Sequence, residues 1–404
     1  MKHRVVITGI GSLFPNGNDP QTYRDNLIAG VSGAAPITTF DASAMPTSIA
    51  AEVKWDGEWV AQDRRTTFAL ETARQAFKDA NRCGSAPKGS GRLCIGVGTE
   101  IFSAADYADM KKPDFEFPQK LSERLKLLHM PGDLVAHVVS ERFQFDYPPL
   151  VMVSTCASSA DAVGSAYREV ASGRCRWMMG GGTDSVINPL GVTAFSKLHT
   201  LSTQNEIPEE ASKPFSRNRD GFLMGEGAGM MILERLEDAQ ERGAEIYAEI
   251  AGYGNALDAY GISEPHPEGR GALQAMQRAL ADAGVNEDEI DVINGHATGT
   301  RKNDPIETLA CKRLLGDRAI EVPICATKCM IGHLVAGAGV AELTATVMCM
   351  NVDMVHPTLN LHDPDPDCDL DYVPLVAREH KTSIALCNSF GFGGMNASTV
   401  VRKL

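Results

Sequence analysis

The sequence contains no apolar run of the roughly 18 residues that a membrane-spanning helix requires. The longest candidate, residues 334–350, is interrupted by Glu342. This excludes a helical membrane protein. The amino end lacks the small-residue cleavage site of a signal peptide, so we expect residues 5–7, Val-Val-Ile, to open a first β-strand. No contact with a membrane is expected.

Positive charge is also scarce. Lys and Arg total 38 against 52 Asp and Glu, which gives a formal net charge of −14. Because phosphates must be met by clustered cations, this balance argues against a general nucleic-acid-binding protein. The net charge is still compatible with a local basic patch that binds one acidic partner.

The cysteines are too dispersed for a disulfide framework. The chain has ten Cys in 404 residues, and several of them, such as Cys94 and Cys387, lie inside apolar runs. This usage indicates buried thiols in a reducing cytoplasm.

The nucleotide-binding glycine motifs are incomplete. Gly9-Ile10-Gly11 lacks the third glycine of a dinucleotide fingerprint and predicts a tight turn instead. The loop NSFGFGGMN, residues 388–396, is not followed by the Lys-Ser/Thr of a phosphate-binding loop. Its glycines let backbone N–H groups approach a ligand, which predicts an oxyanion donor and a flexible gate.

What the sequence does contain is an internal repeat. Four pairs of segments share their pattern in the same order: 69–80 with 272–283, 94–99 with 292–300, 151–156 with 324–329, and 177–184 with 385–396. Together they predict two similar α/β halves, 1–250 and 251–404, with apolar strands covered by helices on both faces. The first half carries an insert at about 103–148, of the kind that forms a cap, a pocket wall or a subunit interface.

Cys156 lies where an apolar strand turns into a helix of small residues. A thiol at a helix amino end is stabilised as the thiolate by the macrodipole and free N–H groups, so we expect the pKa of Cys156 to fall. The alternative interpretation is a buried structural cysteine.

His296 and His333 lie at strand ends of the second half that match strand ends of the first half. Because duplicated halves meet with equivalent strand ends around one pocket, we expect Cys156 and both imidazoles to lie together. We expect Lys328 and Glu342 to form a buried ion pair that stabilises this region and shifts the pKa values of the two histidines. The alternatives are hydrogen-bonded structural histidines and a solvated lysine.

The motifs STCASS, NGHATGT, TKCMIGHL and NSFGFGGMN together resemble the β-ketoacyl-[acyl-carrier-protein] synthases of the elongating Cys-His-His type, over essentially the whole chain. The resemblance implies a thiolase fold with a five-layered αβαβα core. It implies that Cys156 carries the acyl chain as a thioester. It further implies that His296 and His333 promote decarboxylation of a malonyl thioester, and that Lys328 belongs to the active site with Glu342 as its partner.

The same resemblance assigns the remaining parts. Phe392 becomes the gate residue whose N–H forms an oxyanion hole with that of Cys156. The other residues that match the motifs are supporting residues of the histidine loop: Thr298, Thr300 and Asp304. The partners implied are acyl- and malonyl-loaded carrier proteins and a second copy of the chain, or a related subunit. The resemblance implies no redox cofactor and no essential metal, although a monovalent cation near Asn294, Glu342 and Asn388 belongs to the family pattern.

Several positions depart from that pattern. Ala297 replaces a glycine, and Arg301-Lys302-Asn303 replaces a Pro-Ala-Gly stretch in the gate loop. Glu100 and Ile101 stand at the acyl pocket, and Thr155 replaces a small residue before the nucleophile. These changes leave the chemistry alone and leave acyl length and pathway open between fatty-acid and specialised polyketide or polyene synthesis.

Two other functions remain possible for such a chain. A thiolase acting on coenzyme A esters would need a second catalytic cysteine, for which Cys387 is the nearby candidate. A chain-length-factor subunit would not condense, but such subunits lack the nucleophile that this chain keeps. For docking of an acidic carrier protein, the candidate cations are Arg64, Arg65, Arg301 and Lys302.

Overall fold

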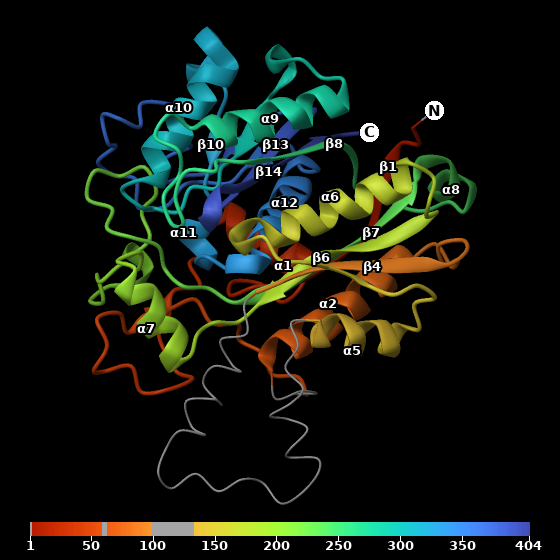
Figure 1. Cartoon of the computed structure of the whole chain (residues 1–404), viewed down its shortest axis with the longest axis horizontal. Coiled ribbons are helices and arrows are strands. Elements are labelled where there is room, and N and C mark those ends of the chain that lie inside the picture. Colours follow the sequence, from red (N-terminus) through yellow and green to blue (C-terminus); the bar gives the residue numbers. More distant parts are fainter. Residues whose placement is uncertain (1, 59–62, 99–132) are drawn as a thin grey trace, which may run out of the picture.

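The computed structural model describes residues 2–58, 63–98 and 133–404. Ten strands of these residues are hydrogen-bonded in the order β10-β9-β13-β14-β8-β1-β7-β6-β4-β5 (Figure 1). In the centre, β1 and β8 pair only through Val5, Val6 and Ile7 of β1. The sheet therefore consists of two five-stranded halves joined at this short contact.

The first half is built from β1 (Val5–Leu13), α1 (Pro20–Ile28), α2 (Arg64–Ala80), β4 (Gly91–Val97), α5 (Leu134–Phe143), β5 (Leu150–Met152), α6 (Ser158–Ala171), β6 (Trp177–Asp184), α7 (Pro189–Lys197), β7 (Gly227–Arg235) and α8 (Leu236–Glu241). A small separate sheet pairs β2 (Ala35–Pro36) with β3 (Ile49–Ala50).

The second half is built from β8 (Ala248–Leu257), α9 (Arg270–Ala283), β9 (Val292–Asn294), α10 (Asn303–Leu315), β10 (Ile324–Cys325), α11 (Lys328–Ile331), α12 (Ala338–Met350), β13 (Ile384–Gly391) and β14 (Met395–Arg402). A further small sheet pairs β11 (Met354–Val355) with β12 (Arg378–Glu379). Short 3₁₀ turns are η1 (Thr155–Ala157), η2 (Pro208–Glu210), η3 (Glu287–Glu289), η4 (Gly316–Ile320), η5 (Val335–Gly337) and η6 (Phe392–Gly394).

The two halves repeat one pairing scheme. In the first half β1, β7 and β6 pair antiparallel, and β6, β4 and β5 pair parallel. In the second half β8, β14 and β13 pair antiparallel, and β13, β9 and β10 pair parallel. Each predicted repeat segment falls on the matching element of its half. We propose the division into two halves on this basis; the predicted boundary at 250/251 falls inside β8, so the second half begins at Ala248.

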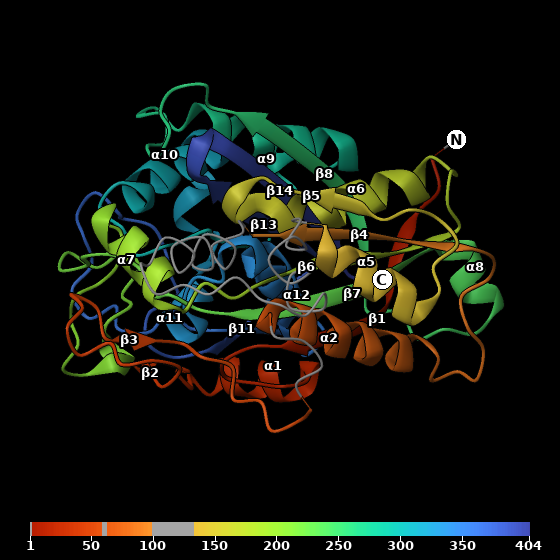
Figure 2. The same cartoon turned by 60° about the horizontal axis from the view of Figure 1, so that its bottom comes forward.

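The helices form three layers around the two halves of the sheet (Figures 1 and 2). Helices α2 and α5 cover the outer face of the first half, and α9 and α10 cover that of the second. Helices α6 and α12 lie between the two halves, where every residue of α12 is buried. This is the predicted five-layered αβαβα arrangement.

The predicted first strand is confirmed, but the predicted tight turn at Gly9-Ile10-Gly11 is wrong, because β1 continues to Leu13. These glycines let α2 approach the strand. A Cβ on Gly9 would lie 2.4 Å from the carbonyl oxygen of Ala76, and one on Gly11 would lie 1.9 Å from that of Thr72. Contacts this short are sterically forbidden, so glycine at both positions permits the outer layer to pack.

Part of the predicted insert, about 103–148, lies outside the described residues. Its described portion, from residue 133, contains α5 and the approach to β5. A search of the described helices finds none long and apolar enough to cross a membrane.

Candidate active site

Cys156 lies in η1, between the end of β5 and the start of α6, as the strand-to-helix pattern predicts. The Ser158 hydroxyl donates to the carbonyl of Thr155 at 2.7 Å and accepts from the N–H of Ser154 at 2.9 Å, which shapes this turn. The Cys156 side chain is buried, with the residue 5 % exposed. The nucleophile is thus presented at the amino end of a helix but away from bulk solvent.

The expected fall in the Cys156 pKa is wrong for this structure, because burial raises the pKa of the thiol to about 11. The positive charge of Lys328 and a hydrogen bond from the backbone N–H of Phe392 oppose this rise. Removal of a charged group from water is the larger effect here. Cys156 is therefore a protonated thiol in the resting site.

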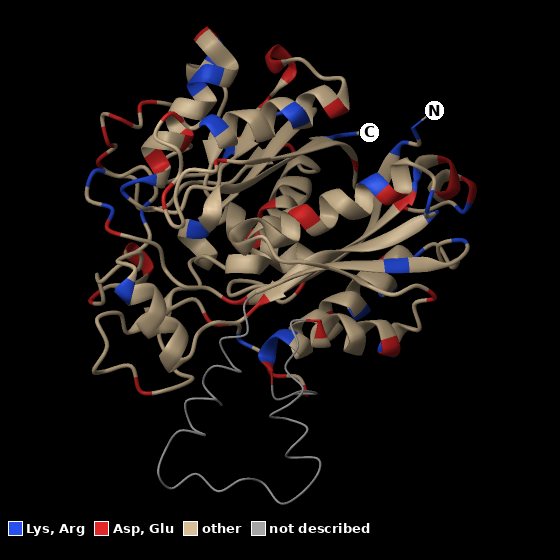
Figure 3. Ribbon diagram, in the orientation of Figure 1, with Lys and Arg blue, Asp and Glu red and all other residues tan. Residues whose placement is uncertain are grey.

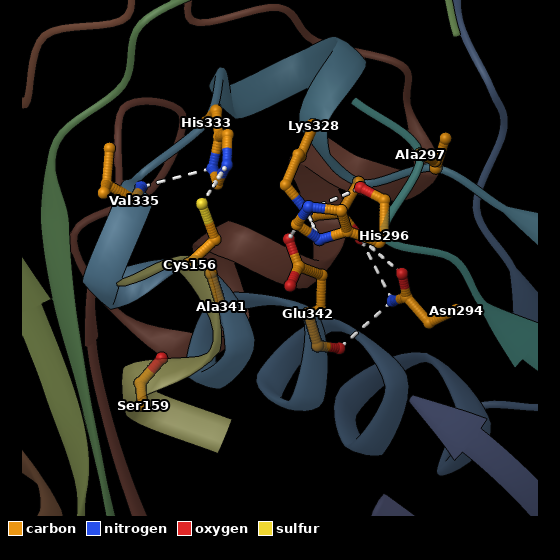
Figure 4. A network of polar contacts seen from close by, with 12 residues as sticks. Cys156, Ser159, Asn294, His296, Ala297, Lys328, His333, Val335, Ala341 and Glu342 are labelled. Atoms are coloured by element: carbon orange, nitrogen blue, oxygen red, sulfur yellow. Dashed lines mark hydrogen bonds and ion pairs between the residues drawn. The ribbon is translucent and has the colours of Figure 1, made fainter. Parts of the chain in front are cut away.

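The His333 ring lies directly over the nucleophile (Figure 4). Its Nε2 is 3.1 Å from Sγ of Cys156, and its Nδ1 accepts from the N–H of Val335 at 3.2 Å. A neutral imidazole that accepts at Nδ1 holds its proton on Nε2. His333 therefore presents an N–H donor to the reaction site.

His296 follows β9 and is oriented in the same manner by Lys328 (Figure 4). The ammonium of Lys328 lies 2.7 Å from the carbonyl oxygen of His296 and 3.3 Å from its Nδ1. Since an ammonium is only a donor, Nδ1 accepts and the ring proton is on Nε2. Burial and the nearby Lys328 charge lower the pKa of both imidazoles well below the ordinary value. Both rings are neutral donors.

The predicted buried pair of Lys328 and Glu342 is present, with 2.6 Å between Nζ and Oε1 and both side chains 1 % exposed. Burial raises the pKa of Glu342, while the Lys328 charge opposes this. The pair places a fixed positive charge beside both histidines and Cys156.

The other oxygen of Glu342, Oε2, is buried without a hydrogen-bond partner among the described residues, which suits a cation. The side-chain oxygens of Asn294 and Asn388, however, already accept hydrogen bonds from Thr327 and Ser398. Each amide oxygen has a second lone pair, so these hydrogen bonds leave both oxygens able to bind a cation, and no step below involves one.

The three reactive side chains open into a cavity of about 550 Å³. Phe392, Thr298 and Thr300 line it. Phe195, Leu198 and Phe222 form an apolar wall, and Arg301 and Lys302 also contribute to the lining. The Thr298 and Thr300 hydroxyls lie 3.0 Å apart. The cavity combines a wide apolar interior with a few polar groups, as a pocket for an acyl thioester requires.

Cys156, His296 and His333 are also the group in the described part of the chain whose ligand atoms could hold a metal, since these atoms lie within 4.8 Å of one another. Coordination through Nε2 would require both ring protons to leave. At Nδ1, the new protons would then face the N–H of Val335 and the ammonium of Lys328. The hydrogen bonds of this site disfavour a metal.

Two buried carboxylates that the sequence analysis did not single out position the histidines. Glu307 of α10 accepts from the N–H groups of His296 and Ala297 at 2.7 and 2.8 Å, where Ala297 has a φ of +41°. Asp184, at the end of β6, accepts from the N–H of Ala336 at 3.0 Å, next to the residue that fixes His333. Asp184 is the last residue of the repeat segment 177–184, a signal that could have located it, whereas no sequence pattern distinguished Glu307.

The remaining predicted residues have different placements. Asp304 is buried and accepts from the N–H groups of Gly299 and Phe215, so it braces the loop after His296 without reaching the cavity. Thr155 is not among the residues lining the cavity; its hydroxyl instead bonds to the carbonyl of Phe392. Glu100 and Ile101, predicted for the acyl pocket, lie outside the described residues.

The predicted docking cations divide into two groups. Arg65 is buried and paired with Asp63, and Arg64 is bound to the buried Glu226. Both therefore serve the internal packing of the α2 amino end. Arg301 and Lys302 are exposed at the cavity. Most of the described ribbon is tan, and the blue and red segments are scattered over it (Figure 3), so this view shows no broad basic face.

Cys387, the cysteine that a thiolase would need, lies inside β13. It is buried, its thiol lies 3.0 Å from the hydroxyl of Thr346, and burial raises its pKa to about 12. It does not line the cavity. A second reactive cysteine is therefore not supplied from this position.

Residues 2–239 match the family described as beta-ketoacyl synthase, N-terminal domain, and residues 247–362 match beta-ketoacyl synthase, C-terminal domain. A 3-oxoacyl-[acyl-carrier-protein] synthase 2 of Synechocystis is 39% identical over 410 residues, covering 100% of this chain and 98% of the relative. One of Coxiella burnetii is 38% identical over 417 residues, covering 100% and 99%.

Solved structures give the same result. The ishigamide ketosynthase/chain length factor superposes with a TM-score of 0.89 and 30% identity, with full coverage of both chains. A type II polyketide ketosynthase, determined with its acyl-carrier protein and bound to a hexaketide, superposes with a TM-score of 0.88 and 30% identity, again with full coverage.

Proposed function

This chain belongs to the β-ketoacyl synthase family, and from that membership we propose that it joins an acyl group held on Cys156 to the malonyl group of a loaded acyl carrier protein. The observation that carries the proposal is the position of Cys156 within 4.8 Å of two imidazoles, both of which hold their proton on Nε2. This condensation has two requirements. It needs a thiol that accepts an acyl group, and it needs hydrogen-bond donors that stabilise an enolate.

In the first half-reaction, the Cys156 sulfur attacks the acyl thioester. The carrier thiol leaves, and the Cys156 proton is transferred to it, so the charge balances. The N–H groups of Cys156 and Phe392 are suited to bind the oxygen of the tetrahedral intermediate, since the Phe392 N–H already points to Sγ. The nearby Lys328 charge lowers the cost of the transient thiolate.

In the second half-reaction, the malonyl thioester loses CO₂, and the electron pair of the broken carbon–carbon bond forms an enolate. The Nε2–H groups of His296 and His333 donate to the enolate oxygen. The enolate carbon attacks the acyl carbonyl, the β-ketoacyl product forms on the carrier, and Cys156 leaves as a thiolate that is reprotonated from solvent. Decarboxylation supplies the carbon nucleophile without a strong base.

The two alternatives fit the site less well. A thiolase needs a second reactive cysteine, and Cys387 lies within a strand away from the cavity. A chain-length-factor subunit needs no nucleophile, whereas here Cys156 lies 3.1 Å from His333. Fatty-acid and polyketide pathways share the chemistry and differ in the acyl chain accepted.

The proposal is tested with purified chain, a ladder of acyl carrier proteins from short to long saturated and polyene chains, and malonyl carrier protein. We expect the acyl-enzyme in the intact mass, one CO₂ per turnover and a β-ketoacyl product two carbons longer. The acyl group with the highest kcat/KM identifies the pathway. Acyl-enzyme without carbon–carbon bond formation would contradict the proposed reaction.

We further propose that Arg301 and Lys302 bind the acidic surface of the carrier protein. Both line the cavity next to the loop of His296, where Lys302 also forms an exposed ion pair with Glu264. The carrier must bring malonate to this opening, and exposed cations there attract acidic surfaces over about 8–10 Å at moderate salt.

Reversal of both charges, Arg301→Glu with Lys302→Glu, should raise the KM for malonyl carrier protein by about 10-fold or more. The KM for a small malonyl thioester, which needs no protein contact, should change little. Initial rates at low and high salt measure this. Equal losses with both substrates would assign the loop to gating alone.

The matched control for charge is Lys88→Glu with Arg174→Glu. These cations pair with Glu241 and Glu169 at exposed sites and do not line the cavity. This control should leave both KM values unchanged. A rise in KM for the carrier substrate here as well would indicate a general charge effect rather than docking.

We also propose a dimer that forms along β5, the last strand of the sheet order. Residues 150–152 are only half-buried, and Val153 next to them is 61% exposed. The described edge therefore presents apolar side chains together with backbone N–H and C=O groups that no described strand pairs. A second copy or a related subunit would cover it, and native mass spectrometry of the chain alone distinguishes these.

We place the enzyme in the cytoplasm because all ten cysteines are free, which cell fractionation can check.

A further inference from the structure

Thr155 holds an unusual backbone conformation directly before the nucleophile. Its φ is +52°, in the left-handed region that β-branched residues rarely enter. Such strain persists only where surrounding contacts over-determine the conformation. The contacts of the Thr155 side chain therefore indicate the role of this strained backbone conformation.

The side chain makes one long-range contact, to the gate loop. The Thr155 hydroxyl donates to the carbonyl oxygen of Phe392 at 3.0 Å, across 237 positions of sequence. The hydroxyl occupies space that Gly391 leaves open, since a Cβ on Gly391 would lie 2.2 Å from Oγ1 of Thr155 and 3.2 Å from the N of Cys156. A threonine before the nucleophile and a glycine before the gate residue thus fit each other.

Other contacts hold the glycines that follow Phe392: the carbonyl of Gly394 accepts from the N–H of Asp258 at 2.8 Å and from the Asn396 amide at 2.9 Å. Gly393 and Gly394 have φ values of +78° and +73°, and the N–H of Gly393 donates to the carbonyl of Ile262 at 2.5 Å. Ile262 belongs to a surface segment and is itself 90% exposed. Phe392 itself has two hydrogen bonds to the interior: its carbonyl accepts from the Thr155 hydroxyl, and its N–H donates to Cys156.

We propose that the Thr155 hydroxyl is a latch that holds the Phe392 loop closed over an acylated Cys156. Thr155 is then a positioning residue: it acts through the peptide groups of Phe392 and touches no substrate. The inference rests on the proposed function, because protection of a thioester requires that Cys156 carry one. With the latch made, the oxyanion donor stays in place and water is kept from the thioester.

The test compares Thr155→Val, which keeps the branched shape but lacks the hydroxyl, with Thr155→Ser, which keeps the hydroxyl. Each variant is loaded from an acyl carrier protein, and loss of the acyl group to water is followed by intact mass. We expect hydrolysis about 5- to 10-fold faster in Thr155→Val, as loss of one hydrogen bond predicts, and near the wild-type rate in Thr155→Ser. Thr193→Val, on the exposed face of α7, removes a hydroxyl elsewhere and should change nothing.

Hydrogen–deuterium exchange of residues 391–394 in the unacylated protein tests the latch without any acyl chemistry. Thr155→Val should raise exchange there and Thr155→Ser should not; Thr155→Ala replaces the valine variant if that chain fails to fold. Wild-type exchange in the valine variant, or equal acceleration by valine and serine, would overturn the latch. A wild-type chain that takes up no acyl group would instead contradict the proposed function, while the exchange experiment still decides on the latch.

Discussion

Replacement of Cys156 by alanine is expected to abolish acyl loading and to reduce condensation on the order of 10⁴-fold or more, the scale seen when an enzyme loses its nucleophile. Malonyl decarboxylation should continue, because His296 and His333 keep their donors. Intact mass after incubation with acyl carrier protein measures loading, and released CO₂ measures decarboxylation. Retained decarboxylation also shows that the variant is folded.

Peptide mapping must accompany the mass measurement, because Cys156 is not the most ionised thiol of the chain. Burial raises the pKa of Cys156 to about 11, whereas hydrogen bonding to Ser85 lowers the pKa of the exposed Cys83. A reactive small thioester will therefore label Cys83, while the carrier-bound acyl group should appear on Cys156. Cys83→Ala is the matched control and should retain full condensation. Carrier-dependent acylation that persists at another cysteine in Cys156→Ala would refute the assignment.

Replacement of His333 by alanine should leave acyl loading of Cys156 in place and reduce release of CO₂ from malonyl carrier protein about 10²- to 10³-fold, the loss typical for one transition-state donor. His296→Ala should have a similar effect. The reason is the location of the ring protons: both imidazoles accept at Nδ1 and offer N–H at Nε2. They can stabilise an enolate but cannot take the thiol proton at Nε2.

The pH dependence adds an independent readout. The pKa of both imidazoles is lowered well below the ordinary value of 6.5, so the neutral donors persist as the pH falls through that value. Neither histidine should therefore give wild-type decarboxylation an inflection near pH 6.5, and an inflection close to pH 7 would report Glu342, the partner of Lys328, whose pKa burial raises to about 7. His362→Ala, at an exposed position outside the cavity, is the control histidine. Normal CO₂ release from both active-site variants would refute this division of labour.

Local patterns in the sequence predicted the strands and helices, and they also predicted that side chains distant in the sequence lie together at one site. The paired segments located the strands of both halves, and from these the union of Cys156, His296 and His333 followed. Their success has a physical reason: strand ends of duplicated sheets face one another, whatever the loops contain.

Quantities that depend on the surroundings of a group were not predicted. The Cys156 position at a helix amino end suggested a lowered pKa, but the extent of burial, which raises it, is set by residues distant in sequence. Arg65 was a candidate cation for docking a carrier protein, but it is buried against Asp63. Glu307 carries no motif, and its role became visible only when α10 was placed under the loop of His296.

The proton arrangement around the two imidazoles also limits which substrates the site can activate. With Nδ1 of His333 facing the N–H of Val335 and Nδ1 of His296 facing an ammonium, neither ring offers a vacant basic nitrogen to the cavity. An acetyl thioester, whose α-carbon must lose a proton before it can attack, therefore finds no base in either imidazole. A thioester whose α-carbon bears a carboxylate generates its own carbanion. The positions of two ring hydrogens thus favour the second substrate over the first.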